Sequence, residues 1–366
     1  MDRDELGAWL RLLETPGLGR ESARKLLAAF GAPQAVLAAS AAARREVVGP
    51  LQSTVLDTEP DNLPALIAAT LAWLSADAAE AREAITIDDP CYPQALLESP
   101  DPPLLFYAQG QIELLQADAI AVVGSRNPTP QGADNARAFA NHLSDAGLTV
   151  VSGLALGVDA AAHAGGLEGV ASTIAVVGTG LDIVYPRRNL ALAHRIAAKG
   201  LIISEYSLGT PSMAQNFPRR NRIIAGLASG TLVVEAALKS GSLITARLAN
   251  EAGRDVFAIP GSIHSPQSRG CHALIKQGAK LVESAADILE DLRLPSTVAG
   301  VVAPDETAHA DAPLLDALGF DPVTLDALAA RTGWSAAELS TRLLGLELDG
   351  LIARLPGQLF QRLPKR

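Results

Sequence analysis

The sequence predicts an α/β protein: a Rossmann-like parallel sheet with an N-terminal helical (SAM/helix-hairpin-helix-like) domain and a C-terminal winged-helix-like domain. Three observations support this prediction. Residues 118–292 alternate short apolar runs with helical segments, residues 1–80 are rich in Ala and Leu, and residues 313–366 give three helical patterns and a hairpin. Nearly continuous apolar strands between helices are typical of a parallel sheet that is covered on both faces.

The first 80 residues are expected to form helices that end at Gly and Pro. Within them, "TPGLGRESARKLL" joins two helical patterns through Pro16, Gly17 and Gly19. This spacing is typical of a helix-hairpin-helix turn, whose N–H groups can hold a phosphate. The alternative is a turn that only connects two helices, and we favour this alternative over a role in binding. The following proline-rich stretch, 88–110, is expected to pack as an extended lead-in to the next domain.

The central domain is expected to span residues 81–292. Its six β-rich runs are "AIAVVG", "LTVVSG", "STIAVVG", "GLIISE", "GTLVVE" and "DVFAIPG". Ligands of such sheets bind beyond the carboxyl ends of the strands, which is where the polar motifs of this chain lie. Residues 293–312 lose periodicity and gain Pro, Thr and acid, which predicts a linker to a winged-helix-like domain at 313–366.

Composition and charge limit the classes of function. The 366 residues are 48% hydrophobic, which is enough for two or three domains, and the net charge is −10. An acidic protein repels phosphates at long range, so nucleic-acid binding would need a local basic site. The acidic start "MDRDELGAWL" and only two cysteines predict a cytoplasmic protein. No membrane association is expected, because no apolar run reaches the roughly 20 residues of a spanning helix.

The stretch "DAIAVVGSRNPTPQG" predicts an anion site where the first apolar run ends at Gly124. A dinucleotide fingerprint needs a second glycine where this chain has Arg126, so NAD in the usual pose is not predicted. A strand-to-helix turn with free N–H groups at Ser125 and an arginine still suits a phosphate. The alternative is an Arg126 that pairs with a carboxylate of the core.

The second run ends at Gly153, in "VVSGLALGVDAAAHAGGL", and adds N–H donors at the same edge of the sheet. Asp159 and His163 follow, four residues apart on one helix face. Such a pair could be catalytic or bind metal, but no third ligand has suitable spacing. A structural hydrogen bond is therefore favoured, and neither a catalytic residue nor a metal site is predicted.

Two basic clusters follow the next two strands. After the third, Arg187, Arg188 and Asn189 suit backbone phosphates and a base edge, although a solvated helix start explains them too. After the fourth, "QNFPRRNRIIAGLASG" combines charge with an aromatic ring, as single-stranded nucleic acid requires. Here the predicted binding residues are Phe217, Arg219, Arg220 and Arg222.

The last motif, "VVEAALKSGSLITARLANEAGRDVFAIPGS", contains a glycine between two serines before a helical pattern. That arrangement predicts a helix start that cradles a phosphate. The residues concerned are Lys239, Ser240, Gly241 and Ser242. No Walker sequence occurs, so ATP hydrolysis is not predicted and no cofactor is expected.

Taken together, these motifs resemble the DNA processing protein A (DprA, also called Smf) family. The matching stretches include "VVGSR", "VVSGLALGVDAAAH", "TIAVVGTGLDIVYPRRN", "FPRRNRIIAGL" and "GCHALIKQGA", and they span 121–279. The resemblance implies a bacterial protein that binds and protects single-stranded DNA in natural transformation and helps load RecA recombinase. It also implies a homodimer without established catalytic activity, in which Arg126 and the basic residues after "YP" and "FP" contact the DNA backbone.

Two other classes of function remain as alternatives. A phosphoribohydrolase-like enzyme could use Arg126 or Arg222 with Glu235, but the "PGGxGTxxE" signature of those enzymes is absent. A transcription regulator would need a basic recognition helix, whereas "SAAELSTRLLGLELDG" carries only Arg342.

Overall fold

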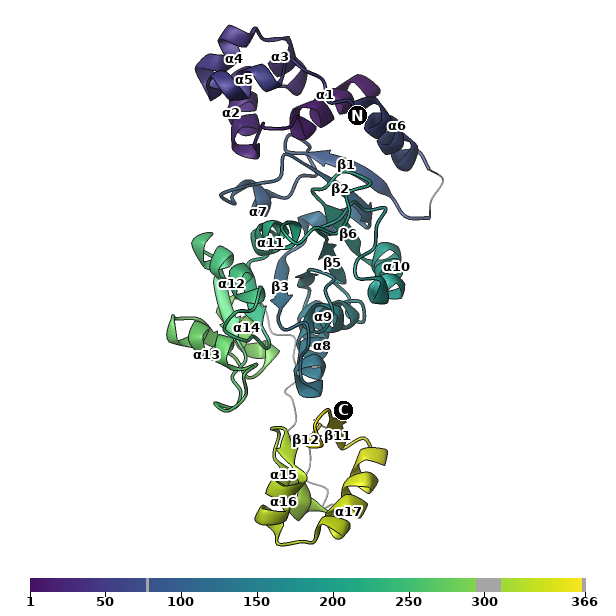
Figure 1. Cartoon of the computed structure of the whole chain (residues 1–366), viewed down its shortest axis with the longest axis vertical. Helices are drawn as coiled ribbons and strands as arrows, with labels where there is room; N and C mark the ends of the chain where they lie inside the picture. The colour runs from purple at the N-terminus through teal and green to yellow at the C-terminus, as the bar shows by residue number, and fades with distance from the viewer. Residues whose placement is uncertain (77–78, 294–310, 364–366) are drawn as a thin grey trace.

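The computed structural model describes residues 1–76, 79–293 and 311–363. The N-terminal helices lie at one end of the molecule, the main sheet in the middle and the C-terminal elements at the other end (Figure 1). The N-terminal helices are α1 (Arg3–Glu14), α2 (Arg20–Phe30), α3 (Pro33–Ala38), α4 (Ala41–Val48), α5 (Pro50–Val55) and α6 (Leu63–Leu74).

The turn between α1 and α2 lies where Pro16, Gly17 and Gly19 predict it. Gly17 has a φ of +85°, which favours glycine, and Gly19 is the N-cap of α2. Apolar side chains of the N-terminal helices, including Leu6 and Trp9, share one core with Leu105 and Tyr107 of the main sheet. The helices therefore pack directly on the sheet.

The main sheet has nine strands in the order β1-β2-β6-β5-β4-β3-β7-β8-β9. Neighbours from β6 to β9 in this order pair in parallel, whereas β1 pairs with β2 and β2 with β6 in antiparallel register. The chain builds outward from β3 to β6 and then returns to place β7 on the other side of β3. The strands are β1 (Arg82–Thr86), β2 (Leu105–Gly110), β3 (Ala119–Val123), β4 (Thr149–Ser152), β5 (Thr173–Val176), β6 (Leu201–Ser204), β7 (Gly230–Val233), β8 (Asp255–Ala258) and β9 (Lys280–Leu281).

Helices cover both faces of this sheet, as the continuous apolar runs predict. In β3, Ile120 and Val122 belong to one core and Ala121 and Val123 to the other, because alternate side chains point to opposite faces. One face carries α8 (Pro130–Asp145), α9 (Val158–Gly166), α10 (Leu190–Lys199) and α14 (Ala285–Asp291). The other carries α7 (Gln94–Leu97), α11 (Asn216–Leu227), α12 (Ser242–Glu251) and α13 (Arg269–Lys276).

All six predicted runs are strands, but β1, β2 and β9 were not predicted. The stretch 88–110, expected to be an extended lead-in, ends in β2, which receives backbone hydrogen bonds from β6 on one side and β1 on the other. Its prolines lie before the strand, where they remove no ladder donor. A short 3₁₀ helix, η1 (Ile112–Gln116), connects β2 to β3.

The C-terminal elements have a hydrophobic core of their own, which includes Leu328, Leu339 and Leu343. Three helices and a hairpin around Pro356 and Gly357 confirm the winged-helix prediction. The predicted linker, 293–312, lies almost entirely outside the described residues. The elements are α15 (Ala312–Leu318), β10 (Val323–Thr324), α16 (Leu325–Thr332), α17 (Ala336–Leu348), β11 (Ile352–Leu355) and β12 (Leu359–Arg362).

Among the helices of the described segments, none is both long enough and apolar enough to cross a bilayer.

Candidate nucleic-acid interface

A pocket of about 800 Å³ opens at the carboxyl ends of the parallel strands. Its walls come from the loops that follow β3, β4, β5, β6, β7 and β8. The pocket lies beside the boundary between β3 and β7, where the direction of chain winding reverses. This is the place at which open α/β sheets bind their ligands. The predicted residues that line it are Gly124, Ser125, Arg126, Phe217, Arg220, Lys239, Ser240, Gly241 and Ser242.

The turn after β3 brings the backbone close to two neighbouring segments. A Cβ at Gly124 would lie 2.7 Å from Val158 Cγ2 and 3.0 Å from the carbonyl oxygen of Glu235, so only glycine fits without a shift. Ser125 Oγ accepts a hydrogen bond from the Asn127 N–H at 3.1 Å. This tight turn places Arg126 on the rim of the pocket.

Arg126 is exposed and lies over the ring of Phe217, with its Cζ 5.7 Å from the ring centroid. In the described residues no carboxylate lies in ion-pair distance of this guanidinium, so the alternative of an arginine paired to a core carboxylate does not hold. Phe217 also contacts Tyr185, at 5.5 Å between ring centroids. An unpaired cation beside two rings can hold a phosphate and stack an unpaired base.

The floor of the pocket is organised by Arg220, whose side chain is only 5% exposed. It donates hydrogen bonds to the carbonyl oxygen of Gly153 at 2.6 Å and to that of Val176, and so joins the ends of β4 and β5. A Cβ at Gly153 would lie 2.1 Å from the guanidinium. Gly153 therefore does not line the pocket but makes room for Arg220.

The charge of Arg220 persists in spite of its burial. Burial lowers its pKa to about 10, and the nearby Asp159 carboxylate, 3.9 Å away, acts in the opposite direction. Burial likewise raises the pKa of Asp159, with Arg220 opposing the shift. Arg220 thus remains a cation at neutral pH and adds positive charge beneath the pocket.

The start of α12 forms a further wall. Ser240 Oγ accepts a hydrogen bond from the Ser242 N–H at 3.3 Å and lies 2.7 Å from Ser242 Oγ. The N–H groups of Leu243 and Ile244 donate to the carbonyl oxygens of Ser240 and Gly241 at 3.2 and 3.1 Å, so the first turn is already hydrogen-bonded. The helix dipole still favours an anion at this end, and the exposed Lys239 lies beside it.

The predicted basic cluster after β5 is not part of the pocket lining. It forms the 3₁₀ turn η2 (Arg187–Asn189). Arg187 and Arg188 are exposed. Asn189 is buried, and its Nδ2 donates to the carbonyl oxygens of Leu154 and Ala155 at 2.9 and 3.1 Å. The amide therefore anchors the loop after β4, which accounts for it without a base contact.

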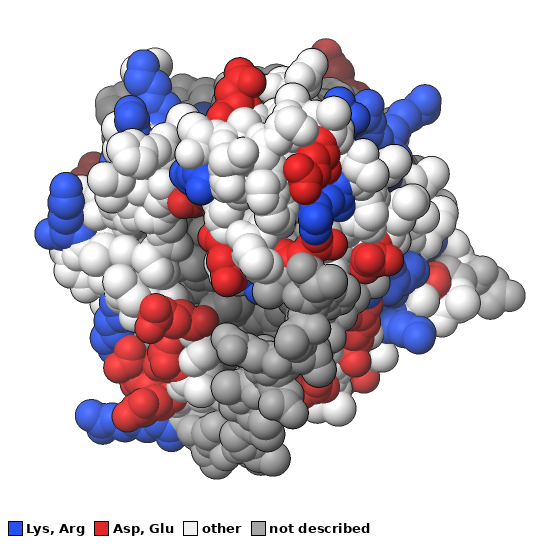
Figure 2. Space-filling view, turned by 90° about the horizontal axis from the view of Figure 1, so that it is seen from below, with Lys and Arg blue, Asp and Glu red and all other residues white. Residues whose placement is uncertain are grey.

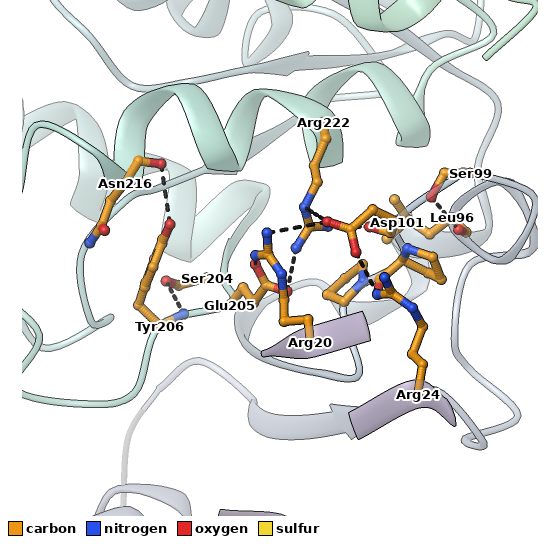
Figure 3. A network of polar contacts seen from close by, with 12 residues as sticks. Arg20, Arg24, Leu96, Ser99, Asp101, Ser204, Glu205, Tyr206, Asn216 and Arg222 are labelled. Atoms are coloured by element: carbon orange, nitrogen blue, oxygen red, sulfur yellow. Dashed lines mark hydrogen bonds and ion pairs between the residues drawn. The ribbon is translucent and has the colours of Figure 1, made fainter. Parts of the chain in front are cut away.

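The structure separates the three arginines of α11. Arg219 is exposed, Arg220 lies under the pocket, and Arg222 points to the junction with the N-terminal helices (Figure 3). Arg222 Nε lies 2.9 Å from Asp101 Oδ2, and its Nη2 pairs with Glu205. Because these protein carboxylates occupy the guanidinium, Arg222 is not available to DNA in this structure.

Glu235 is also turned away from the pocket. Its carboxylate accepts hydrogen bonds from the N–H of Thr129 at 2.9 Å and from Thr129 Oγ1 at 2.6 Å, at the start of α8. Burial raises the pKa of Glu235, and the hydrogen bonds from Thr129 oppose this. The oxygens of Glu235 thus stabilise the start of a helix. Neither Arg126 nor Arg222 pairs with this carboxylate, as the enzyme alternative would require.

Asp159 and His163 each hydrogen-bond to a separate backbone N–H. His163 Nε2 accepts from Leu154 N at 3.2 Å, and burial lowers the pKa of His163 to about 3, so the ring is neutral. Asp159 Oδ2 accepts from Ala155 N at 3.3 Å. Across residues 1–76, 79–293 and 311–363, no group of three or more His, Cys, Asp or Glu side chains could hold a metal ion.

Several lining residues are absent from the set of site residues predicted from the sequence. Tyr185 lies in the loop that carries Arg187 and Arg188, so an aromatic beside a basic pair was the available signal. Further polar lining residues outside that set lie in loops or on α9, α11 and α12. They are Asn127, Asp159, Ser212, Asn221, Thr245 and Gln267, of which only Asp159 belongs to a pattern noted in the sequence.

The family model described as "DNA recombination-mediator protein A" matches residues 83–293, the segment that contains this pocket. The chain belongs to this family. A second model, described as "DprA winged helix domain", matches residues 301–358. The resemblance to the DprA/Smf family is thereby confirmed.

Curated relatives agree with this assignment. Protein Smf from Escherichia coli is 44% identical over 282 residues, which is 75% of each chain. DNA processing protein DprA from Streptococcus pneumoniae is 49% identical over 56% of this chain and 73% of its own length.

Two solved structures are similar to the fold. The crystal structure of DNA processing protein A from Streptococcus pneumoniae matches with a TM-score of 0.68 and 38% identity, over 78% of this chain and 97% of that one. The other, from Helicobacter pylori, has a TM-score of 0.53 and 31% identity, over 58% of this chain and 96% of that one. Its title concerns the single-stranded DNA binding mode of DNA processing protein A.

Proposed function

We propose that this protein binds single-stranded DNA in the pocket beyond β3 and β7. The observation that carries the proposal is Arg126: an exposed guanidinium over the ring of Phe217, near Tyr185 and the start of α12, with no carboxylate in ion-pair distance among the described residues. Phosphates need the charge, and unpaired bases need flat surfaces. The family and the relative from Helicobacter pylori, whose title names single-stranded DNA, support the same ligand.

The test is fluorescence anisotropy of a labelled random-sequence single strand at several salt concentrations, with duplex DNA as competitor. We expect preference for the single strand. Arg126→Ala should weaken binding about ten- to a hundredfold and lower the salt slope by about one, because one phosphate contact is lost. Arg137→Ala is the control. Arg137 lies on α8, pairs with Glu168 and is not part of the pocket lining. Equal binding by wild type and Arg126→Ala would refute the proposal.

Biologically, the proposal extends to natural transformation in the cytoplasm: the protein protects incoming DNA and helps load RecA recombinase onto it, as a homodimer. Nuclease protection of a bound strand and RecA filament assembly with and without the protein test the first two roles. Sedimentation of the intact chain tests the third. A protein that binds strands but leaves RecA assembly unchanged would limit the function to DNA binding.

Catalysis is not part of the proposal, because Glu235 faces Thr129 and not the pocket. The decisive assay is hydrolysis of purine nucleoside monophosphates. Turnover that is lost in Glu235→Gln would overturn the binding function in favour of the enzyme.

The winged-helix elements do not favour duplex recognition either. Arg342 pairs with Asp311 and Glu338 and lies over Trp334, so the single basic residue of α17 is already engaged. Acidic and basic side chains are interspersed on the molecular face seen from this end (Figure 2). In 311–363, arginines 331, 342, 354 and 362 are outnumbered by the acidic residues at 311, 316, 321, 326, 338, 347 and 349.

A further inference from the structure

Three large apolar side chains are exposed in the segments that form the walls of the pocket. Tyr185, Met213 and Leu238 keep 46%, 38% and 59% of their surface in contact with solvent. They come from three different loops, after β5, β6 and β7. Tyr185 lines the pocket itself, and both chain neighbours of Met213 and both of Leu238 line it too.

Met213 and Leu238 have no packing role that explains them. Among the described residues, neither belongs to a hydrophobic core cluster. Single exposed apolar residues are normal on a protein surface, but several around one cavity mark a place for an apolar ligand surface. Val170 offers a comparison. It is 81% exposed, lies just before the amino end of β5 and is not part of the pocket lining.

The charged groups of the pocket cannot by themselves distinguish single strands from duplex DNA, because both present phosphates. The faces of the bases differ: they are stacked inside a duplex, which displays only base edges in its grooves, whereas a single strand leaves them open. An apolar rim therefore gains contact only with unpaired bases.

We propose that Met213 and Leu238 contact the faces of unpaired bases next to the pocket and so select single strands over duplex. The inference rests on the proposed function, since it assigns these side chains to a strand whose phosphates Arg126 holds. Apolar contacts release no counterions, so their contribution is independent of salt. That property separates Met213 and Leu238 from the arginines of the same site.

The test uses the double variant Met213→Ser with Leu238→Ser and three probes: a single strand with bases, an abasic strand of equal length, and a duplex. We expect roughly tenfold weaker binding of the base-containing strand. The salt slope, binding of the abasic strand and binding of the duplex should match those of wild type. Val170→Ser is the matched control and should bind all three probes as wild type does.

Undiminished binding of the base-containing strand by the double variant would overturn the inference. An equal loss on the abasic strand would overturn it too, since the side chains would then act through the backbone or the fold. Failure of the proposed function is distinguishable from both outcomes, because wild type would then bind no single strand, or Arg126→Ala would bind as tightly as wild type.

Discussion

The pocket and the junction beneath the N-terminal helices place arginine in opposite environments on either side of α11. At the pocket, Arg126 is exposed and, among the described residues, has no carboxylate in ion-pair distance. At the junction, Arg20, Arg24 and Arg222 surround Asp101 and Glu205.

Figure 3 shows this junction, where side chains from α2, from the loop before β2, from the end of β6 and from α11 converge. Arg20 pairs with Glu205 at 2.7 Å, and Arg24 pairs with Asp101 at 2.5 Å. The comparison teaches that an arginine is available to a nucleic acid only where it is exposed and no carboxylate pairs with it, as for Arg126 but not for Arg222. Substitutions should therefore affect DNA binding on one side of α11 and stability on the other.

Gly153→Val should have the largest effect and impair both properties. The new side chain would displace the guanidinium of Arg220 from the carbonyl oxygens that hold it, leaving a buried charge without its hydrogen bonds. We expect a loss of about 3 kcal/mol or more in the free energy of unfolding, measured by chemical denaturation. Gly241→Ala is the control for stability, because a Cβ there meets nothing within 4 Å and its φ is −63°. A fully stable Gly153→Val protein would show that Arg220 is not fixed by these contacts.

Arg222→Met should destabilise the fold without weakening DNA binding. The substitution leaves Asp101 and Glu205 with fewer cations, and we expect a loss of about 2 kcal/mol, less than for a fully buried pair because Asp101 is 30% exposed. Denaturation and anisotropy on the same preparation measure both properties. Normal stability with lost affinity for the single strand would reverse the assignment of the two sides.

Arg219→Met sharpens the comparison on the same helix. Arg219 is exposed three residues before Arg222, so its loss should change stability by less than about 0.5 kcal/mol. If the strand passes the start of α11, the salt slope of binding should fall by about one with a modest loss of affinity. An unchanged slope would place the strand elsewhere on the rim.

Glu235→Gln should have the smallest effect, and its sign depends on pH. Burial raises the pKa of Glu235 above the ordinary 4.5, so the folded state binds this proton more tightly than the unfolded chain. Wild-type stability from this group is therefore present at low pH and is lost as pH rises through the raised pKa. The amide cannot titrate, so relative to wild type the variant should gain stability as pH rises from 4.5 to 8.

Unfolding of both proteins across that pH range provides the measurement. A stability difference that stays constant with pH would contradict the raised pKa. Binding of the single strand at neutral pH should match wild type, because the carboxylate faces Thr129.

Much of the fold could be predicted because its signals are local. The six apolar runs became β3 to β8, and the glycine turn after α1 formed where it was expected. The antiparallel strands β1 and β2 could not be predicted, since proline-rich surroundings hide their pattern and their partners are distant in the chain. The opposite directions of two arginines could have been predicted from helix geometry. Arg220 and Arg222 lie about 200° apart around α11, so they do not face the same ligand.

The sequence by itself determined the residue types at the strand ends: the glycines, serines and arginines that follow β3, β4, β6 and β7 and mark an anion site. Only the tertiary structure decided which of these groups remain free. Arg126 keeps its charge for a ligand, whereas Arg222 pairs with Asp101 and Glu205 and Glu235 accepts hydrogen bonds from Thr129. The reason is physical: charge is a property of one residue, but its pairing depends on partners that folding brings together. Asp101 lies 121 positions from Arg222 in the chain, and Thr129 lies 106 positions from Glu235.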